Sequence, residues 1–107
     1  MPYIDPNVLN PYLKAIEKWL RNNPDLDQSE SLNIFKEIIR QTAESHKLNL
    51  STFFSRLSFI IDHYSITPAF AWQLHHLRIL SHRKENDSSW DRSITQKINI
   101  NLLRSIR

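Results

Sequence analysis

The sequence predicts an all-α protein, a single compact bundle of about five helices. Three observations support this prediction. Glycine is absent from all 107 residues, whereas the tight turns of β-hairpins depend on Asn-Gly and similar pairs. A capping residue stands directly before proline at Asn10–Pro11 and at Thr67–Pro68, an order typical of helix starts. Apolar residues also recur at intervals of three and four along most of the chain, which is the helical period.

The first two helices are predicted from their start and stop signals. One begins near Asn10–Pro11, with a short turn at Asp5–Pro6 before it, and ends ahead of Pro24, because a residue that precedes proline avoids the helical region. The next opens with a capping box from Asp27 to Glu30, whose two ends satisfy each other's backbone N–H groups. The residues predicted to face the core are Leu13, Ile16 and Leu20 in the first helix, with Tyr12 and Trp19 beside them, and Leu32, Phe35, Ile38, Ile39 and Thr42 in the second.

The third and fourth helices carry apolar stripes and are joined by a short turn. The third runs from about Ser51 to Tyr64, and the fourth starts at Thr67–Pro68. Phe59 lies off the main stripe of the third helix, so we expect this helix to be buried on two sides and to form the centre of the fold. The residues predicted to face the core are Phe53, Phe54, Leu57, Ile60, Ile61 and Tyr64 in the third helix and Phe70, Leu74, Leu77 and either Leu80 or Ser81 in the fourth.

The last helix is predicted to start around Ser88 or Ser89, with Asp91 in its first turn, where the helix dipole favours an acid. Residues 97–101 alternate between polar and apolar as a strand does, and Asn and Ile are mediocre helix formers. A lone strand would find no partner elsewhere in the chain. The prediction for residues 94–103 is therefore a helix, with a strand as the alternative.

Two missing residue types exclude several classes of functional site. The chain has no cysteine, which excludes disulfides, zinc–thiolate sites, iron–sulfur clusters and cysteine nucleophiles. Without glycine it cannot form the phosphate-binding loops of the Walker or dinucleotide-binding type. No two of the five histidines stand four residues apart, the spacing at which one helix chelates a metal ion. We therefore expect no catalytic residues, metal, cofactor or small-molecule substrate, and we predict that the chain is not an enzyme.

The chain is expected to be one domain over residues 1–107, either complete in itself or the N-terminal domain of a longer protein. Apolar residues make up 40% of it and charged residues 23%, the balance of an ordinary globular domain. No apolar run approaches the roughly 18 residues that a membrane span needs, and the first residues lack the layout of a signal peptide. We therefore predict a cytoplasmic protein that makes no contact with a membrane.

The uneven distribution of charge makes nucleic-acid binding the alternative function. Residues 1–50 carry six Lys/Arg and seven Asp/Glu, a net charge of −1, whereas residues 51–107 carry eight and four, a net charge of +4. Basic surfaces attract phosphates by releasing counterions. The turn between the third and fourth helices has the layout of a helix-turn-helix, although Ser65 stands where a glycine would ease the turn. In this interpretation the contacts would be Gln73, His75, Arg78, Arg83 and Lys84.

Apolar residues that lie off the core-facing stripes indicate a partner surface. Phe59, Trp72 and Ile79 are predicted to be such residues, and together they would form an exposed patch of the kind that marks a protein interface. The bundle could instead bury them among its own helices. We therefore predict a non-enzymatic interaction module that associates with another protein or with itself, as an accessory domain of a larger assembly.

Overall fold

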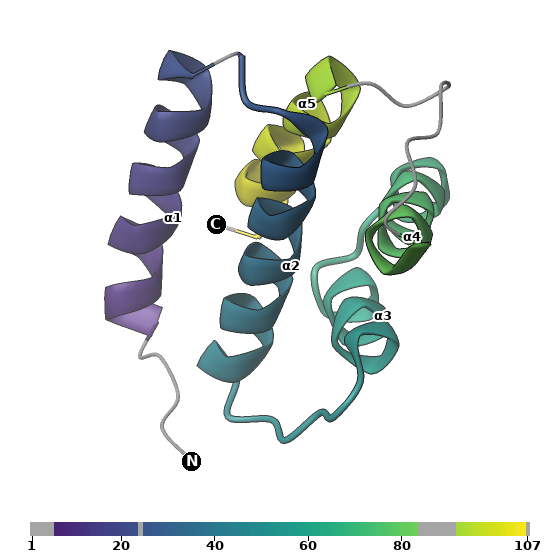
Figure 1. The fold of residues 1–107 in the computed structure, drawn as a ribbon. Coiled ribbons are helices and arrows are strands. Elements are labelled where there is room, and N and C mark those ends of the chain that lie inside the picture. Colours follow the sequence, from purple (N-terminus) through teal and green to yellow (C-terminus); the bar gives the residue numbers. More distant parts are fainter. Residues whose placement is uncertain (1–5, 24, 84–91, 107) are drawn as a thin grey trace.

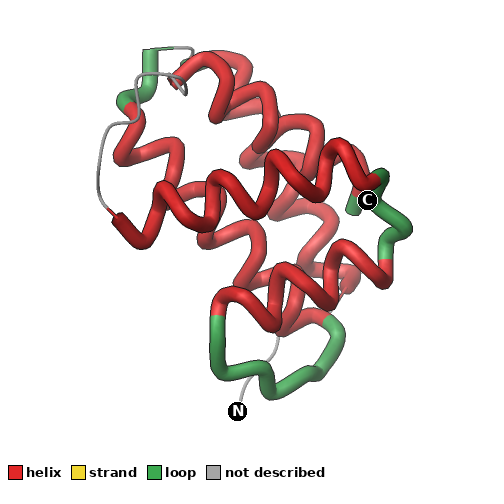
Figure 2. Tube along the Cα trace, turned by 90° about the vertical axis from the view of Figure 1, so that its right-hand side faces the viewer, coloured by secondary structure: helices red, strands yellow, loops and turns green. Residues whose placement is uncertain are grey.

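The computed structural model describes residues 6–23, 25–83 and 92–106, and the regular secondary structure of these ranges is entirely helical (Figures 1 and 2). The helices within them are α1 (Pro6–Asn22), α2 (Gln28–Ser45), α3 (Phe53–His63), α4 (Pro68–Arg83) and α5 (Arg92–Ser105). The predicted all-α bundle of five helices is thus confirmed, and residues 94–103 are helical rather than a strand.

Helix α2 is the centre of the bundle, because it contacts each of the other four helices. Figure 1 shows α1 on one side of it and the α3–α4 pair on the other. Its Phe35 is fully buried and meets the ring of Phe53 edge-on, with the centroids 5.6 Å apart. The prediction that the third helix forms the centre is wrong. Of the 11 residues of α3, only Leu57 and Ile60 are buried, whereas the longer α2 buries residues along its whole length.

Side chains cap the starts of α2, α3 and α4. Asp27 Oδ1 accepts a hydrogen bond from the backbone N–H of Glu30 at 2.7 Å, which confirms the N-cap half of the predicted capping box. Thr67 caps α4 in the same way at 3.3 Å, as predicted. Thr52 caps α3 at 3.1 Å, so this helix begins slightly later than the apolar pattern suggested.

Helix α1 begins at Pro6, and Pro11 lies inside it. The prediction of a start near Asn10–Pro11 is wrong by about one turn. A proline within a helix forgoes the hydrogen bond from its own nitrogen to the carbonyl four residues earlier. For Pro11 that carbonyl belongs to Asn7, which lies in the first turn of α1. The loss is therefore confined to the end of the helix, and the helical course continues through the proline.

Helix α5 buries side chains with the helical period and not with the alternation of a strand. The buried residues are Thr95, Gln96, Ile98, Asn99, Leu102 and Leu103. Asn99, a polar position in the alternating segment, is fully buried, and its Nδ2 donates a hydrogen bond to the backbone carbonyl of Ser31 in α2 at 3.0 Å. The predicted helix start at Ser88 or Ser89 and the predicted first-turn acid Asp91 lie outside the described residues.

The turn between α3 and α4 is a Schellman motif built around a serine. The backbone N–H of Ile66 donates to the carbonyl of Ile61 at 3.1 Å, and that of Ser65 donates to the carbonyl of Asp62 at 3.4 Å. Ser65 has a φ of 51°, a left-handed conformation that glycine adopts without a steric penalty. The serine therefore stands at the position where the sequence pattern called for glycine.

Ser65→Gly is expected to raise the free energy of unfolding by about 0.5–1 kcal/mol, because relief of left-handed strain outweighs the entropy that glycine adds to the unfolded chain. Urea unfolding followed by circular dichroism measures the change. Ser51→Gly is the matched control, since Ser51 is an exposed loop residue without a positive φ. It should lower the free energy of unfolding slightly. Equal changes in the two variants would argue against strain at Ser65.

Candidate partner-binding surface

Helix α4 turns two large apolar side chains away from the core. Leu74 and Leu77 are fully buried, whereas the side of the helix opposite them carries Trp72, which is 68% exposed, and Ile79, which is 40% exposed. These two residues stand seven apart, so they lie on the same side of the helix, two turns from each other. The leucines determine this orientation, because their burial leaves Trp72 and Ile79 no place in the core.

Phe54 of α3 is a third large apolar side chain at the surface, and its ring lies beside His75 and Arg78 of α4. It is 54% exposed, so its prediction as a core residue is wrong. The guanidinium carbon of Arg78 lies 5.1 Å from the centre of its ring, a cation–π contact. Its neighbour Phe53 is the side chain that turns inward against Phe35. Two adjacent phenylalanines at the start of a helix cannot both face the same core, and the packing of α2 selects Phe53.

His75 links the two helices across this surface. Its ring lies 5.7 Å from that of Phe54, and its Nδ1 accepts a hydrogen bond from Nε of Arg78 at 3.5 Å. Burial, and then the positive charge of Arg78, hold the pKa of His75 below its ordinary value. A neutral ring fits its role as acceptor from the guanidinium. We call the surface formed by Phe54, Trp72, His75, Arg78 and Ile79 the α3–α4 face.

Phe59 does not join Trp72 and Ile79, contrary to the predicted patch. It is partly buried against the core, and its ring stacks on His63 with the centroids 5.2 Å apart. His46, at the end of α2, covers another side of it at 5.2 Å. Phe59 thus belongs to an aromatic cluster between the ends of α2 and α3. The helical pattern placed it off the main stripe of α3 but could not show that α2 lies there.

The residues proposed for nucleic-acid contact are only partly brought together. Gln73 is exposed near the start of α4, whereas His75 and Arg78 are half-buried beside Phe54. The side chain of Arg83 and the whole of Lys84 lie outside the described part of the structure. The side chain of Arg78 is therefore held by its own protein, across the ring of Phe54, and is not extended into solvent.

Neither the models of protein families nor the curated proteins and solved structures that were compared with the chain match it. Within residues 6–23, 25–83 and 92–106, no three His, Asp or Glu side chains gather closely enough to hold a metal ion. In the same ranges no helix combines the length and the apolar character that a bilayer crossing requires.

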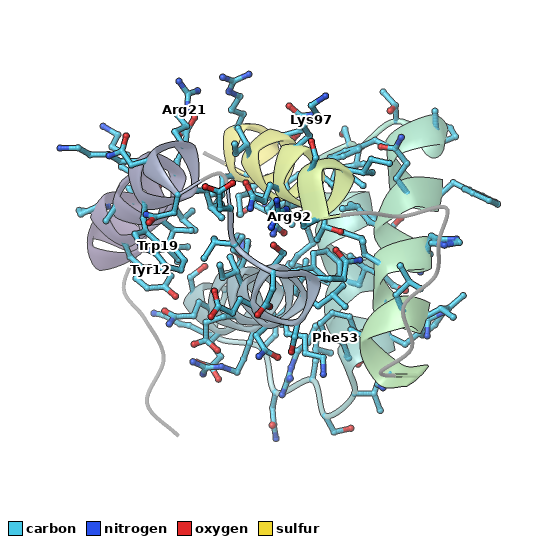
Figure 3. All side chains as sticks on the ribbon, turned by 45° about the horizontal axis from the view of Figure 1, so that its top comes forward. Tyr12, Trp19, Arg21, Phe53, Arg92 and Lys97 are labelled. Carbon is cyan, nitrogen blue, oxygen red and sulfur yellow. The ribbon has the colours of Figure 1, made fainter. Side chains whose placement is uncertain are left out.

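A groove between α1 and α2 was missed by sequence reasoning. It has a volume of about 410 Å³ and is lined by Tyr12, Ile16, Trp19, Asn33, Ile34 and Glu37. Figure 3 shows Tyr12 and Trp19 beside each other on α1. Burial, and then the charge of Glu37, raise the pKa of Tyr12. The spacing of Tyr12, Ile16 and Trp19 was the available signal, but it also fits residues that flank a core.

Proposed function

We propose that this chain is a non-enzymatic interaction module whose α3–α4 face binds a segment of another protein. The observation that carries the proposal is that three large apolar side chains are exposed on two helices that pack against each other: Phe54 on α3, and Trp72 and Ile79 on one side of α4. Single exposed apolar residues are ordinary, whereas apolar side chains gathered on one surface mark sites of association. Tryptophan in particular is enriched among the residues that dominate binding energy.

The charge around these side chains indicates the chemistry of the partner. Helix α4 contains no Asp or Glu in its 16 residues, but it contains Arg78 and Arg83. The guanidinium of Arg78 already lies at the edge of the apolar surface, over Phe54. A partner segment with apolar residues next to Asp or Glu would therefore complement both the shape and the charge of the α3–α4 face.

The same charges favour a foreign partner over a second copy of the chain. In a two-fold symmetric dimer the same surface meets itself, so the guanidinium of Arg78 in one copy would lie near that of Arg78 in the other. Like charges placed together at an interface oppose association. A foreign segment with acidic residues meets no such repulsion, which is why we prefer it to self-association.

Selection from a random peptide display library, with the purified protein as bait, tests the proposal. The selected peptides should combine aromatic or aliphatic residues with Asp or Glu. Trp72→Ala should weaken their binding at least about tenfold in isothermal titration calorimetry, the loss typical of an interface residue worth more than about 1.4 kcal/mol. Trp19→Ala is the matched control, because Trp19 is also exposed but lies on α1.

Three results would contradict the proposal. Selected peptides that are basic would exclude the predicted charge complementarity. Loss of binding in Trp19→Ala with retention in Trp72→Ala would place the site in the α1–α2 groove. Light scattering that shows a dimer in the wild type and a monomer in Trp72→Ala would assign the α3–α4 face to self-association instead.

A further inference from the structure

Helices α1 and α5 pack against each other and present their basic residues on one surface. Five exposed cations lie there, and we call them the α1–α5 basic face: Lys14, Lys18, Arg21, Lys97 and Arg104. Figure 3 shows Arg21 of α1 and Lys97 of α5 extending toward the same side of the molecule. Neither helix dominates this surface, which exists because the first and last helices of the chain are neighbours.

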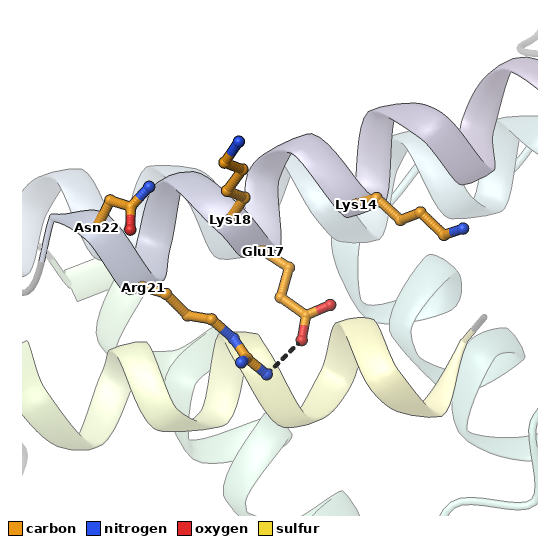
Figure 4. Close-up of a pocket in the computed structure, with 5 residues that line it drawn as sticks. All are labelled: Lys14, Glu17, Lys18, Arg21 and Asn22. Atoms are coloured by element: carbon orange, nitrogen blue, oxygen red, sulfur yellow. Dashed lines mark hydrogen bonds and ion pairs between the residues drawn. The ribbon is translucent and has the colours of Figure 1, made fainter.

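A buried carboxylate holds two of these cations in place. Glu17 is only 8% exposed, and its Oε1 lies 2.8 Å from Nη2 of Arg21 and 3.5 Å from Nε of Arg104. Figure 4 shows the side chains of Glu17 and Arg21 extending from α1 over α5. One carboxylate thus positions guanidinium groups from two helices, and the exposed parts of both groups keep donors for an external anion.

The remaining cations of the face have no such partner. No ion pair among the described residues involves Lys14, Lys18 or Lys97. Together with Glu17, the five cations give a net charge of +4. Lys14 and Arg21 stand seven residues apart on α1, and Lys97 and Arg104 do so on α5, a separation of about 10.5 Å along each helix. The face is therefore two short rows of positive charge on adjacent helices, in which Arg21 and Arg104 are held by Glu17.

The lining of this surface distinguishes between two kinds of polyanion. A shallow hollow of about 340 Å³ on α1 is lined only by polar and charged side chains: Lys14, Glu17, Lys18, Arg21 and Asn22 (Figure 4). Binding to an anionic bilayer combines charge attraction with the insertion of apolar side chains, and the hollow offers none. Binding to the backbone of a nucleic acid is dominated by charge and by the release of counterions.

We propose that the α1–α5 basic face binds the phosphate backbone of a nucleic-acid duplex, without reading its sequence. The proposed contacts are the five cations of the face, and Glu17 is a positioning residue that orients Arg21 and Arg104. This surface shares no residue with the α3–α4 face. The chain can therefore hold a nucleic acid with α1 and α5 while α3 and α4 hold a protein segment.

Fluorescence anisotropy with a labelled duplex tests the proposal. The logarithm of the association constant should fall with the logarithm of salt concentration with a slope of about −4.5, at about −0.9 for each of the five phosphate contacts. Removing three cations in Lys14→Gln/Lys18→Gln/Lys97→Gln should reduce the magnitude of this slope by about 2.7 and the affinity at about 100 mM salt by at least tenfold. Duplexes of unrelated sequence should bind alike.

The matched control removes three positive charges elsewhere, in Lys36→Gln/Lys47→Gln/Arg83→Gln. It should retain the affinity of the wild type within about twofold, because its residues lie on α2, in the loop that follows α2 and on α4, and none of them is a proposed phosphate contact. Equal losses in the two triple variants would show attraction by net charge alone and overturn the proposal. A loss confined to the control variant would place the contact outside α1 and α5 and overturn the proposal. Stronger binding to vesicles of anionic phospholipid than to duplex, at equal phosphate concentration, would assign the face to membrane binding. This result would also overturn the proposal.

Discussion

Phe35→Ala is expected to lower the free energy of unfolding by about 3–5 kcal/mol. Phe35 is fully buried in α2, the helix that contacts every other helix of the bundle. Truncation removes the apolar area of the ring and leaves a cavity that neighbouring helices fill only in part. Since domains of this size are stable by only about 5–15 kcal/mol, urea unfolding should show a midpoint far below that of the wild type.

Phe54→Ala is the matched control, because it makes the same chemical change at a ring that is 54% exposed. It should cost about 1 kcal/mol or less, since an exposed truncation away from the core leaves no cavity. The two variants together distinguish the structure, in which only Phe35 is buried in the core, from the sequence pattern, which predicts both phenylalanines in the core. Similar losses in Phe35→Ala and Phe54→Ala would contradict the described arrangement of α2 and α3.

Asn99→Asp is expected to lower the free energy of unfolding at pH 7 by about 3–5 kcal/mol, the usual consequence of an unpaired charge in a protein interior. Asn99 is fully buried between α5 and α2, where its Nδ2 donates to the carbonyl of Ser31. The substitution is nearly isosteric but replaces that donor with an oxygen and adds a negative charge. Urea unfolding at neutral pH measures the loss.

The loss in Asn99→Asp should depend on pH in a defined direction. Burial raises the pKa of the introduced carboxyl in the folded state above its value of about 3.9 in the unfolded chain. The penalty is therefore absent below the unfolded pKa and grows as pH rises through the folded one. Asn101→Asp, at an exposed position of the same helix, should stay within about 0.5 kcal/mol of the wild type. No loss in Asn99→Asp at pH 7 would show that Asn99 is not buried, and a loss that did not diminish toward pH 4 would show that a buried charge is not its cause.

Local signals in the sequence were sufficient to predict the helices and the first residues of two of them. Asp27 and Thr67 accept backbone N–H groups as their position before an apolar stripe predicts, because a cap depends on residues within one turn. The start of α1 was misplaced at Pro11, since proline is favoured at the first helical position and an earlier proline, Pro6, takes that position. Helix α5 was identified in spite of its alternating residues, from the lack of any partner strand.

The residues of the candidate surfaces could be predicted less completely from local signals in the sequence. Trp72 and Ile79 could be placed opposite the leucines of α4 from spacing alone, and the structure leaves both exposed. The sequence could not show that Phe59 differs from these two residues, because the side chain that covers it, His46, belongs to the end of another helix. Phe54 was assigned to the core because its spacing equals that of buried residues. A helical period identifies one apolar side but does not show how far the neighbouring helix reaches along it.

The sequence by itself determined the helical class of the protein, the capping of its helices and the side of α4 that avoids the core. Each of these features depends on residue types, that is on composition, or on neighbours within a few positions along the chain. Only the tertiary structure decided that α2 is central, that Phe53 rather than Phe54 turns inward, and that Lys14, Lys18 and Arg21 lie beside Lys97 and Arg104. Counted along the chain, these cations fall into an acidic half and a basic half. They form one surface because burying the apolar sides of α1 and α5 against α2 brings the first and last helices into contact, and no local interaction encodes that proximity.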